Sequence, residues 1–181
     1  GPDESIALID AGADISIICG LIRRPPIYLH AASGITGIAD LRGRTIAGIS
    51  ARFGSSLNLR LLLEDEGLTQ ADYRIEHVGG SHERFAALQS GRTAAALLSP
   101  PTNGDAQSAG FALLANVPER HPAFMFSAIQ ANNSFAQRNA DALVAYLRAE
   151  IRAQAVLRDP ARKNDCIGLL AQADGIPFEA A

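Results

Sequence analysis

The sequence predicts an α/β fold built on a parallel sheet, and three observations lead to this prediction. Short β-rich runs alternate with helical stretches between residues 45 and 98. Gly67 and Gly91 follow two of these helical stretches, at the position where helices commonly end. Hydrophobic residues make up 48% of the 181 residues, which is enough to bury a core without disulfides or metals. Two consecutive strand–helix–strand units require a parallel sheet with right-handed crossovers.

Charge and composition exclude several classes of protein. The 16 basic residues, of which Lys163 is the single lysine, are slightly outnumbered by 19 acidic ones, for a formal net charge of -3. Because the basic residues are scattered singly or in pairs, they form no field that would follow a phosphate backbone, and we expect no nucleic-acid partner. The apolar content excludes a disordered chain. No apolar run approaches the roughly 20 residues of a membrane-spanning helix.

The first part of the chain predicts one helix followed by two strands. Residues 3–11 predict a helix because two acidic residues stand in its first turn and Gly12 follows as a stop. Residues 15–19 and 27–31 are β-rich, and the prolines between them exclude a helix. These strands are expected to enter or leave a hinge.

The middle of the chain supplies the regular pattern behind the predicted sheet, and the last third is helical. Strands are expected at 45–49, 73–78, 94–98, 111–115 and 123–129, with helices at 55–66, 81–90 and 105–109. A long helix is expected over 141–157, with a stripe of apolar residues spaced four apart on one face. Asn132 or Asn133 would cap a helical turn before it, and Asp159 with Pro160 begins a further helix that ends at Gly175.

Ligands of open parallel sheets bind beyond the carboxyl ends of the strands, where helices begin. Three loops meet this description, at residues 50–56, 79–82 and 99–103. Candidate contacts are Phe53, Gly54, Ser55, Ser56, Gly80, Ser81 and Ser99. The alternative for the serines is that they only cap helices, Ser81 above all. His82 and Glu83 are either an acid–base pair or a solvated first turn.

Three further candidates come from the first part of the chain. Pro2 and Asp3 stand at a helix start, and Arg23 is a possible clamp for a carboxylate or sulfonate, although adjacent arginines usually point in different directions. No nucleophile elbow, phosphate loop or dinucleotide motif is present, so we predict no catalytic residue and no cofactor. The four histidines lack ligand spacing, which predicts no metal site. Cys19 and Cys166 are expected to be buried thiols.

Several segments, in this order and spacing, resemble one family of proteins. They are AGAD at 11–14 with ISIICGLIRRPPIYL after it, IADLRGRTIA at 38–47, HVGG at 77–80, FAALQSGR at 85–92, and AALLSPP at 95–101. The chain resembles the solute-binding proteins of nitrate, sulfonate and taurine type ABC importers. It departs from their pattern at Ala94, where members of the family usually carry an aspartate.

The resemblance implies a type II periplasmic-binding fold, in which two lobes joined by a hinge close on one small molecule. Residues 1–33 would be part of lobe 1 and the first hinge strand, 34–118 lobe 2, and 119–181 a helical return to lobe 1, with hinge positions near Ala32 and Pro118. The start and the end of the first lobe would be absent from this chain. The candidate contacts named above would be the ligand site.

The same resemblance implies a function. It implies a monomeric, periplasmic protein without enzymatic activity, which binds a small anionic or polar organic molecule of the sulfonate, nitrate or pyrimidine-precursor class. Its partner would be an ABC permease in the membrane. Two alternatives stay open: an enzyme of thiamine-pyrimidine biosynthesis on the same fold, whose cysteine-rich signature is not found here, and the effector-sensing domain of a transcription regulator.

Overall fold

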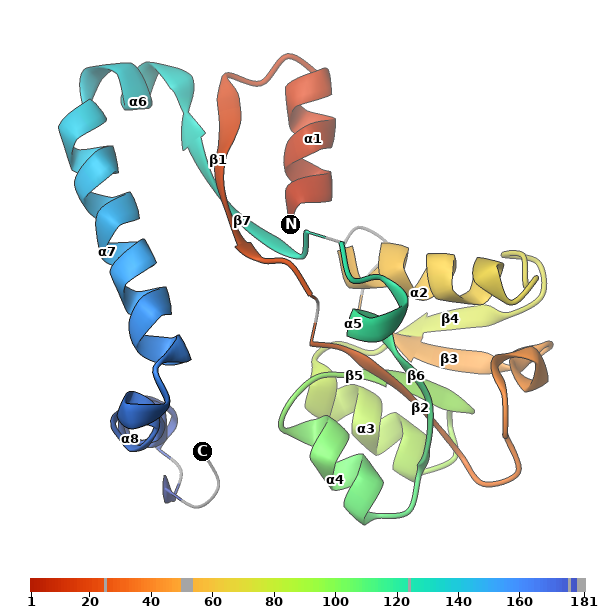
Figure 1. Cartoon of the computed structure of the whole chain (residues 1–181). Helices are drawn as coiled ribbons and strands as arrows, with labels where there is room; N and C mark the ends of the chain where they lie inside the picture. Colours follow the sequence, from red (N-terminus) through yellow and green to blue (C-terminus); the bar gives the residue numbers. More distant parts are fainter. Residues whose placement is uncertain (25, 50–53, 124, 176, 179–181) are drawn as a thin grey trace. The chain divides into compact units, whose positions relative to one another are not determined.

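The computed structural model describes residues 1–24, 26–49, 54–123, 125–175 and 177–178. These residues form two compact units, Gly1–Ala131 and Asn132–Ala181 (Figure 1). The first unit contains both sheets, and the second consists of helices. No helix in the described part of the chain combines the length and the apolar character needed to cross a membrane.

A five-stranded sheet in the order β4-β3-β5-β2-β6 forms the centre of the first unit (Figure 1). Its strands are β2 (Tyr28–Ala31), β3 (Thr45–Gly48), β4 (Arg74–His77), β5 (Ala95–Leu98) and β6 (Ala112–Asn116). β3 runs parallel to both β4 and β5, which confirms the two strand–helix–strand units. β2 is antiparallel to β5 and β6, so the sheet is mixed rather than wholly parallel. β2 is reached by a short proline-containing connection instead of a crossover helix, and its direction is therefore free to differ.

Helices cover both faces of this sheet (Figure 1). They are α2 (Gly54–Asp65), α3 (Ser81–Gln89), α4 (Thr102–Ser108) and α5 (Val117–Arg120), with a 3-10 turn, η1 (Ile38–Leu41). On one face Leu59, Leu62 and Leu63 of α2 pack with Leu29 and Leu97 of the sheet. On the other, α3 and α4 pack small residues against the alternate positions of the same strands. Strand residues that alternate between the two faces thus bury both sides of the sheet.

A second, two-stranded sheet pairs β1 (Ile15–Ile22) with β7 (Ser127–Asn132). α1 (Pro2–Asp10) packs against β1. β7 begins four residues later than the strand expected at 123–129. Just before it, the Phe126 amide donates to the Ile22 carbonyl at 2.8 Å and brings the two strands together.

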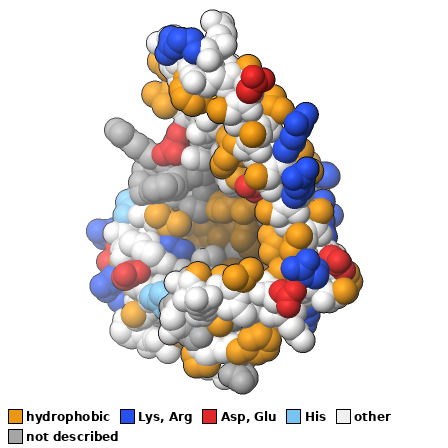
Figure 2. Space-filling view, turned by 90° about the vertical axis from the view of Figure 1, so that its left-hand side faces the viewer, with side chains coloured by type: hydrophobic (Ala, Val, Ile, Leu, Met, Phe, Trp, Pro, Cys, Tyr) orange, Lys and Arg blue, Asp and Glu red, His pale blue; other side chains and the backbone are white. Residues whose placement is uncertain are grey.

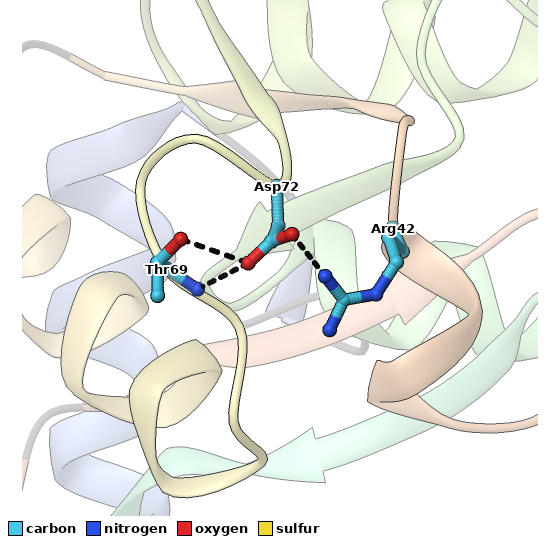
Figure 3. A network of polar contacts seen from close by, with 3 residues as sticks. All are labelled: Arg42, Thr69 and Asp72. Atoms are coloured by element: carbon cyan, nitrogen blue, oxygen red, sulfur yellow. Dashed lines mark hydrogen bonds and ion pairs between the residues drawn. The ribbon is translucent and has the colours of Figure 1, made fainter.

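Asp72 ties together two loops at the edge of the five-stranded sheet (Figure 3). Its carboxylate accepts hydrogen bonds from the amide and the hydroxyl of Thr69, each at 2.8 Å, and forms an ion pair with Arg42. The hydrogen bonds from Thr69 lower the pKa of Asp72, and the Arg42 charge adds to the effect. In the same way, hydrogen bonds from Thr36 lower the pKa of Asp40. Both carboxylates therefore favour the folded state while they are ionised.

His30 is fully buried in β2, and no described residue makes a hydrogen bond of ordinary geometry to either ring nitrogen, although the backbone of Phe111 lies close by. It alternates with Leu29 and Ala31, so it faces the layer of α3 and α4. Burial lowers the pKa of His30, opposed in part by the backbone of Phe111. The ring is consequently held neutral in the folded protein.

The second unit contains α6 (Asn133–Arg138), α7 (Ala140–Arg158), the 3-10 turn η2 (Pro160–Arg162) and α8 (Lys163–Asp174). Asn132 caps α6 by accepting from the Phe135 amide at 2.9 Å, and the Asp159 carboxylate accepts from Ala161 at the start of η2, as expected. Gly175 ends α8 in the left-handed conformation that glycine favours, with φ 65°.

The apolar stripe predicted on the long helix lies on α7, but no residue of α7 is buried and Ile151 is 65% exposed. Leu157 and Leu169 are 70% and 68% exposed. Figure 2 shows hydrophobic side chains on the surface, with basic ones among them. Cys19 and Cys166 are free thiols, each partly rather than fully buried.

Candidate ligand-binding site

The parallel strands bring three helix starts to one edge of the sheet. Gly48 at the end of β3 pairs with His77 at the end of β4, and Leu98 ends β5 beside them. α2, α3 and α4 each begin a few residues beyond these strand ends. The carboxyl edge predicted from the sequence is therefore formed by connections three to five residues long, which hold the helix starts close to the strands.

A hydroxyl network joins the second and third of these connections. Ser81 Oγ accepts a hydrogen bond from the Ser99 amide at 3.0 Å and shares a second one with Thr102 Oγ1. Thr102 Oγ1 also lies 2.7 Å from the Ser99 carbonyl, to which it donates. Ser81 thus fixes Ser99 in place. The Ser99 hydroxyl is not used in this network and makes no hydrogen bond within the described residues.

The expectation that Ser81 caps α3 is wrong. Gly80 is the N-cap, in extended backbone, and Ser81 is the first residue of the helix. The Ser81 hydroxyl is occupied by the neighbouring connection instead of its own helix, a tertiary contact that local sequence does not reveal.

Arg84 is the residue of this edge that sequence analysis missed. It is 2% exposed, and its Nε donates to the Leu97 carbonyl at 2.5 Å and its Nη1 to the Gly79 carbonyl at 2.6 Å. It therefore links the end of β5 to the turn before α3. Burial lowers the pKa of Arg84 to about 10, a fall that the nearby Glu83 carboxylate limits. The sequence signal that could have revealed its burial was its spacing of three and four residues from Ala87 and Leu88, with which it shares the buried face of α3.

Glu83 occupies the start of α3. A side chain added at Gly80 would meet Glu83 Oε2 at 2.7 Å, so this carboxylate bends back over the turn. The positive end of the α3 dipole is thus already met by a negative charge. No hydrogen bond joins Glu83 to the neighbouring His82, and both are exposed, which favours the interpretation of a solvated first turn.

The remaining predicted contacts lie on three elements. Ser56 is buried in the first turn of α2, whose first two residues are Gly54 and Ser55. Phe53 lies outside the described residues. Pro2 is buried and Asp3 is partly buried at the start of α1, and α1 contacts α2. Arg23 is exposed directly after β1 and forms no ion pair with a described residue.

The described residues contain no group of three histidines, cysteines or carboxylates that could hold a metal ion. What the edge does offer is hydrogen-bonding groups at fixed positions: helix starts, a hydroxyl at Ser99, and a buried arginine that holds the two connections in register. Such an arrangement can bind a polar molecule without chemistry on it.

The arrangement is a mixed α/β fold with a polar carboxyl edge. The chain belongs to the family described as NMT1/THI5 like, which matches residues 2–162. A search among curated proteins found no match.

Solved structures of binding proteins share the fold. The alkanesulfonate-binding protein SsuA from Xanthomonas axonopodis pv. citri, bound to MOPS, superposes with a TM-score of 0.81 at 20% identity over 99% of this chain. The periplasmic aliphatic sulphonate binding protein SsuA from Escherichia coli gives 0.80 at 23% identity, again over 99%. The periplasmic nitrate-binding protein NrtA from Synechocystis PCC 6803 gives 0.71 at 13% identity over 92%.

The chain spans 62%, 61% and 47% of the length of these three proteins. They confirm the resemblance to solute-binding proteins of sulfonate and nitrate importers and the mixed α/β fold.

Proposed function

We propose that this protein is the solute-binding component of an ABC importer, which captures a small anionic or polar organic molecule outside the cytoplasm and delivers it to a membrane permease. The single observation that carries the proposal is the carboxyl edge, where the Ser81–Ser99–Thr102 network and buried Arg84 hold two connections rigidly beside each other. A rigid polar edge without a catalytic set suits binding better than turnover.

The ligand site in this proposal comprises the starts of α1, α2 and α3 together with Ser99. Pro2, Asp3, Gly54, Ser55, Ser56, Gly80, Ser81 and Ser99 are its proposed residues, and Arg23 and Phe53 would complete it. Because Glu83 already neutralises the start of α3, a ligand with a single compact charge would rest mainly on the other groups. A sulfonate, nitrate or pyrimidine precursor would each present acceptors to amides and hydroxyls.

Lobe closure is part of the proposal. The chain leaves the five-stranded sheet twice, from β2 back to β1 and from α5 on to β7, and β1 and β7 pair with each other. Two paired strands at such a passage suit a hinge. The predicted hinge positions lie within the sheet unit, Ala32 directly after β2 and Pro118 in α5. Closure, a monomeric state and a periplasmic location stay predictions.

Calorimetric titration of the chain with ethanesulfonate, taurine, nitrate and a hydroxymethylpyrimidine tests the proposal. At least one of them should bind saturably to the wild-type chain. Ser99→Ala should then weaken that binding by about fivefold, the equivalent of about 1 kcal/mol for one hydrogen bond, without loss of stability because the Ser99 backbone contacts remain.

Ser90→Ala is the matched control. Ser90 lies at the opposite end of α3, where its hydroxyl donates to Ala87, and this variant should bind like the wild type. Equal affinity of Ser99→Ala and Ser90→Ala would remove Ser99 from the site. Turnover of the pyrimidine, followed by chromatography, would favour the enzymatic alternative instead.

A further inference from the structure

Arg84 carries a positive charge that its contacts within the fold do not require. The side chain is 2% exposed and donates to two neutral groups, the carbonyls of Leu97 and Gly79. Carbonyl oxygens also accept from a neutral donor, such as a side-chain amide. Burial of a full charge costs desolvation free energy unless an opposite charge compensates for it. The two hydrogen bonds therefore explain a buried donor at this position but not a buried cation.

No carboxylate in the described part of the chain forms an ion pair with Arg84. Burial lowers the pKa of Arg84 more than the neighbouring Glu83 raises it. Glu83 is exposed, so water screens its charge, and its carboxylate bends over the turn at Gly80. Arg84 is thus a buried cation whose charge the described residues compensate only in part.

The guanidinium of Arg84 also has unused donors. Nε donates to Leu97 and Nη1 to Gly79, but the third nitrogen, Nη2, makes no hydrogen bond to any described residue. Nη2 is not sealed inside the protein, because the buried polar atoms that lack a partner in the described chain all belong to other residues. A ligand atom can therefore reach Nη2, although the rest of the side chain is enclosed.

The two carbonyls that hold Arg84 place its guanidinium at the carboxyl edge. Leu97 stands two residues before Ser99 near the end of β5, and Gly79 directly precedes the N-cap of α3. A guanidinium is planar and rigid, so the hydrogen bonds of Nε and Nη1 fix the position of Nη2 as well. The unused hydroxyl of Ser99 belongs to the same edge. This edge thus offers a charged donor at a fixed position together with a neutral one.

We propose that Arg84 binds the ligand directly: Nη2 donates to an oxygen of an anionic head group, and Arg84 makes the site selective for anions over neutral polar molecules. The inference rests on the proposed function and deepens it, since it favours the sulfonate and nitrate classes over an uncharged pyrimidine. An anion at Nη2 supplies the opposite charge that the buried cation lacks. Because the fold already holds the guanidinium in place, little side-chain freedom is lost on binding.

NMR of arginine side chains tests the proposal on the wild-type chain, where no loss of stability intervenes. In a chain with isotope-labelled arginines, the Nε–H of Arg84 is buried and hydrogen-bonded, so its signal should persist where those of exposed arginines exchange with water. Its disappearance in Arg84→Lys assigns it. Ethanesulfonate, taurine or nitrate, whichever binds by calorimetry, should shift this signal with the same Kd. An unmoved signal with the anion bound would overturn the proposal.

Three variants separate the charge of Arg84 from its contribution to stability. Arg84→Met should weaken binding of the anion by about tenfold or more, because a hydrogen bond between charged partners is lost. Arg84→Lys keeps the charge and should lose less. Leu88→Ala is the matched control, since it empties a position on the same buried face of α3 without removal of a donor, and it should bind like the wild type. Equal affinity in Arg84→Met and Leu88→Ala would contradict the assignment.

Neutral compounds distinguish this inference from the proposed function. Ethanesulfonamide, the uncharged analogue of ethanesulfonate, should bind at least about tenfold more weakly, because it brings no charge to Arg84. Equal affinity for the two, or binding of the hydroxymethylpyrimidine without binding of any anion, would overturn the role of Arg84 and leave the proposed function standing. Binding of none of these compounds would count against both.

Discussion

The two compact units of this chain differ in how far their apolar residues are buried. In Gly1–Ala131 the five-stranded sheet buries leucines and alanines on both faces, several of them completely. In the helical unit from Asn132 onward, α7 buries no residue. Leu143 and Leu147 of α7 are half-buried, whereas Leu157 and the leucines of α8 are exposed. The sheet unit thus supplies its own stability, while the helices of the second unit have capped ends but no core among the described residues.

The largest expected effect tests this comparison directly. Leu97→Ala empties a position that is 2% exposed in the main core cluster, and it should lower the free energy of unfolding by about 2–5 kcal/mol. Leu157→Ala, at a position that is 70% exposed, should change it by at most about 0.5 kcal/mol. Urea denaturation of both variants makes the measurement. Equal losses would show that the helical unit has a core that its exposure does not reveal.

Arg84 carries the next largest effect. Arg84→Met should cost about 2–3 kcal/mol, because the carbonyls of Leu97 and Gly79 lose charged donors in a buried position. The stability of Arg84→Lys should lie between those of the wild type and Arg84→Met, because lysine keeps the charge but cannot donate to both carbonyls at once. The same denaturation experiment measures this. An unchanged free energy of unfolding in Arg84→Met would mean that water replaces the guanidinium without loss of stability.

The third effect is the pH dependence of stability that His30 causes. The pKa of His30 is lowered from 6.5 in the folded protein, so the unfolded chain takes up a proton first as the pH falls. Stability should therefore be complete above about 6.5 and decline as the pH falls from there toward the folded pKa. His30→Gln should flatten this part of the curve in thermal melts across the pH range. An unchanged slope in the variant would assign the decline to other groups.

Asp72 is the smallest expected effect and acts in a lower pH range. Its lowered pKa means that its contribution is present above the ordinary value of 3.8 and disappears as the pH falls through the folded value. Asp72→Asn should lower the melting temperature at neutral pH and leave it unchanged once the carboxylate is protonated. Arg42→Gln should cost less, because the side chain is 61% exposed and the Thr69 hydrogen bonds remain. A larger loss for Arg42→Gln would reverse this order.

Local sequence was enough for most elements and for the three connections at the carboxyl edge. Helix and strand periodicities located β3, α2, β4, α3 and β5. Asn132 and Asp159 were correctly predicted as the caps at which α6 and η2 begin. The direction of β2, the role of Ser81 and the buried Arg84 all depend on residues distant in the chain, which periodicity does not report.

Hydrogen–deuterium exchange with and without saturating ethanesulfonate, taurine or nitrate tests the central claim that a ligand binds at the carboxyl edge. We predict that one of them slows exchange in the segments at residues 78–82 and 98–103, while the helical unit from residue 140 onward keeps its exchange rates. Protection confined to other segments, or no protection with any of the three at concentrations where calorimetry shows binding, would contradict the claim.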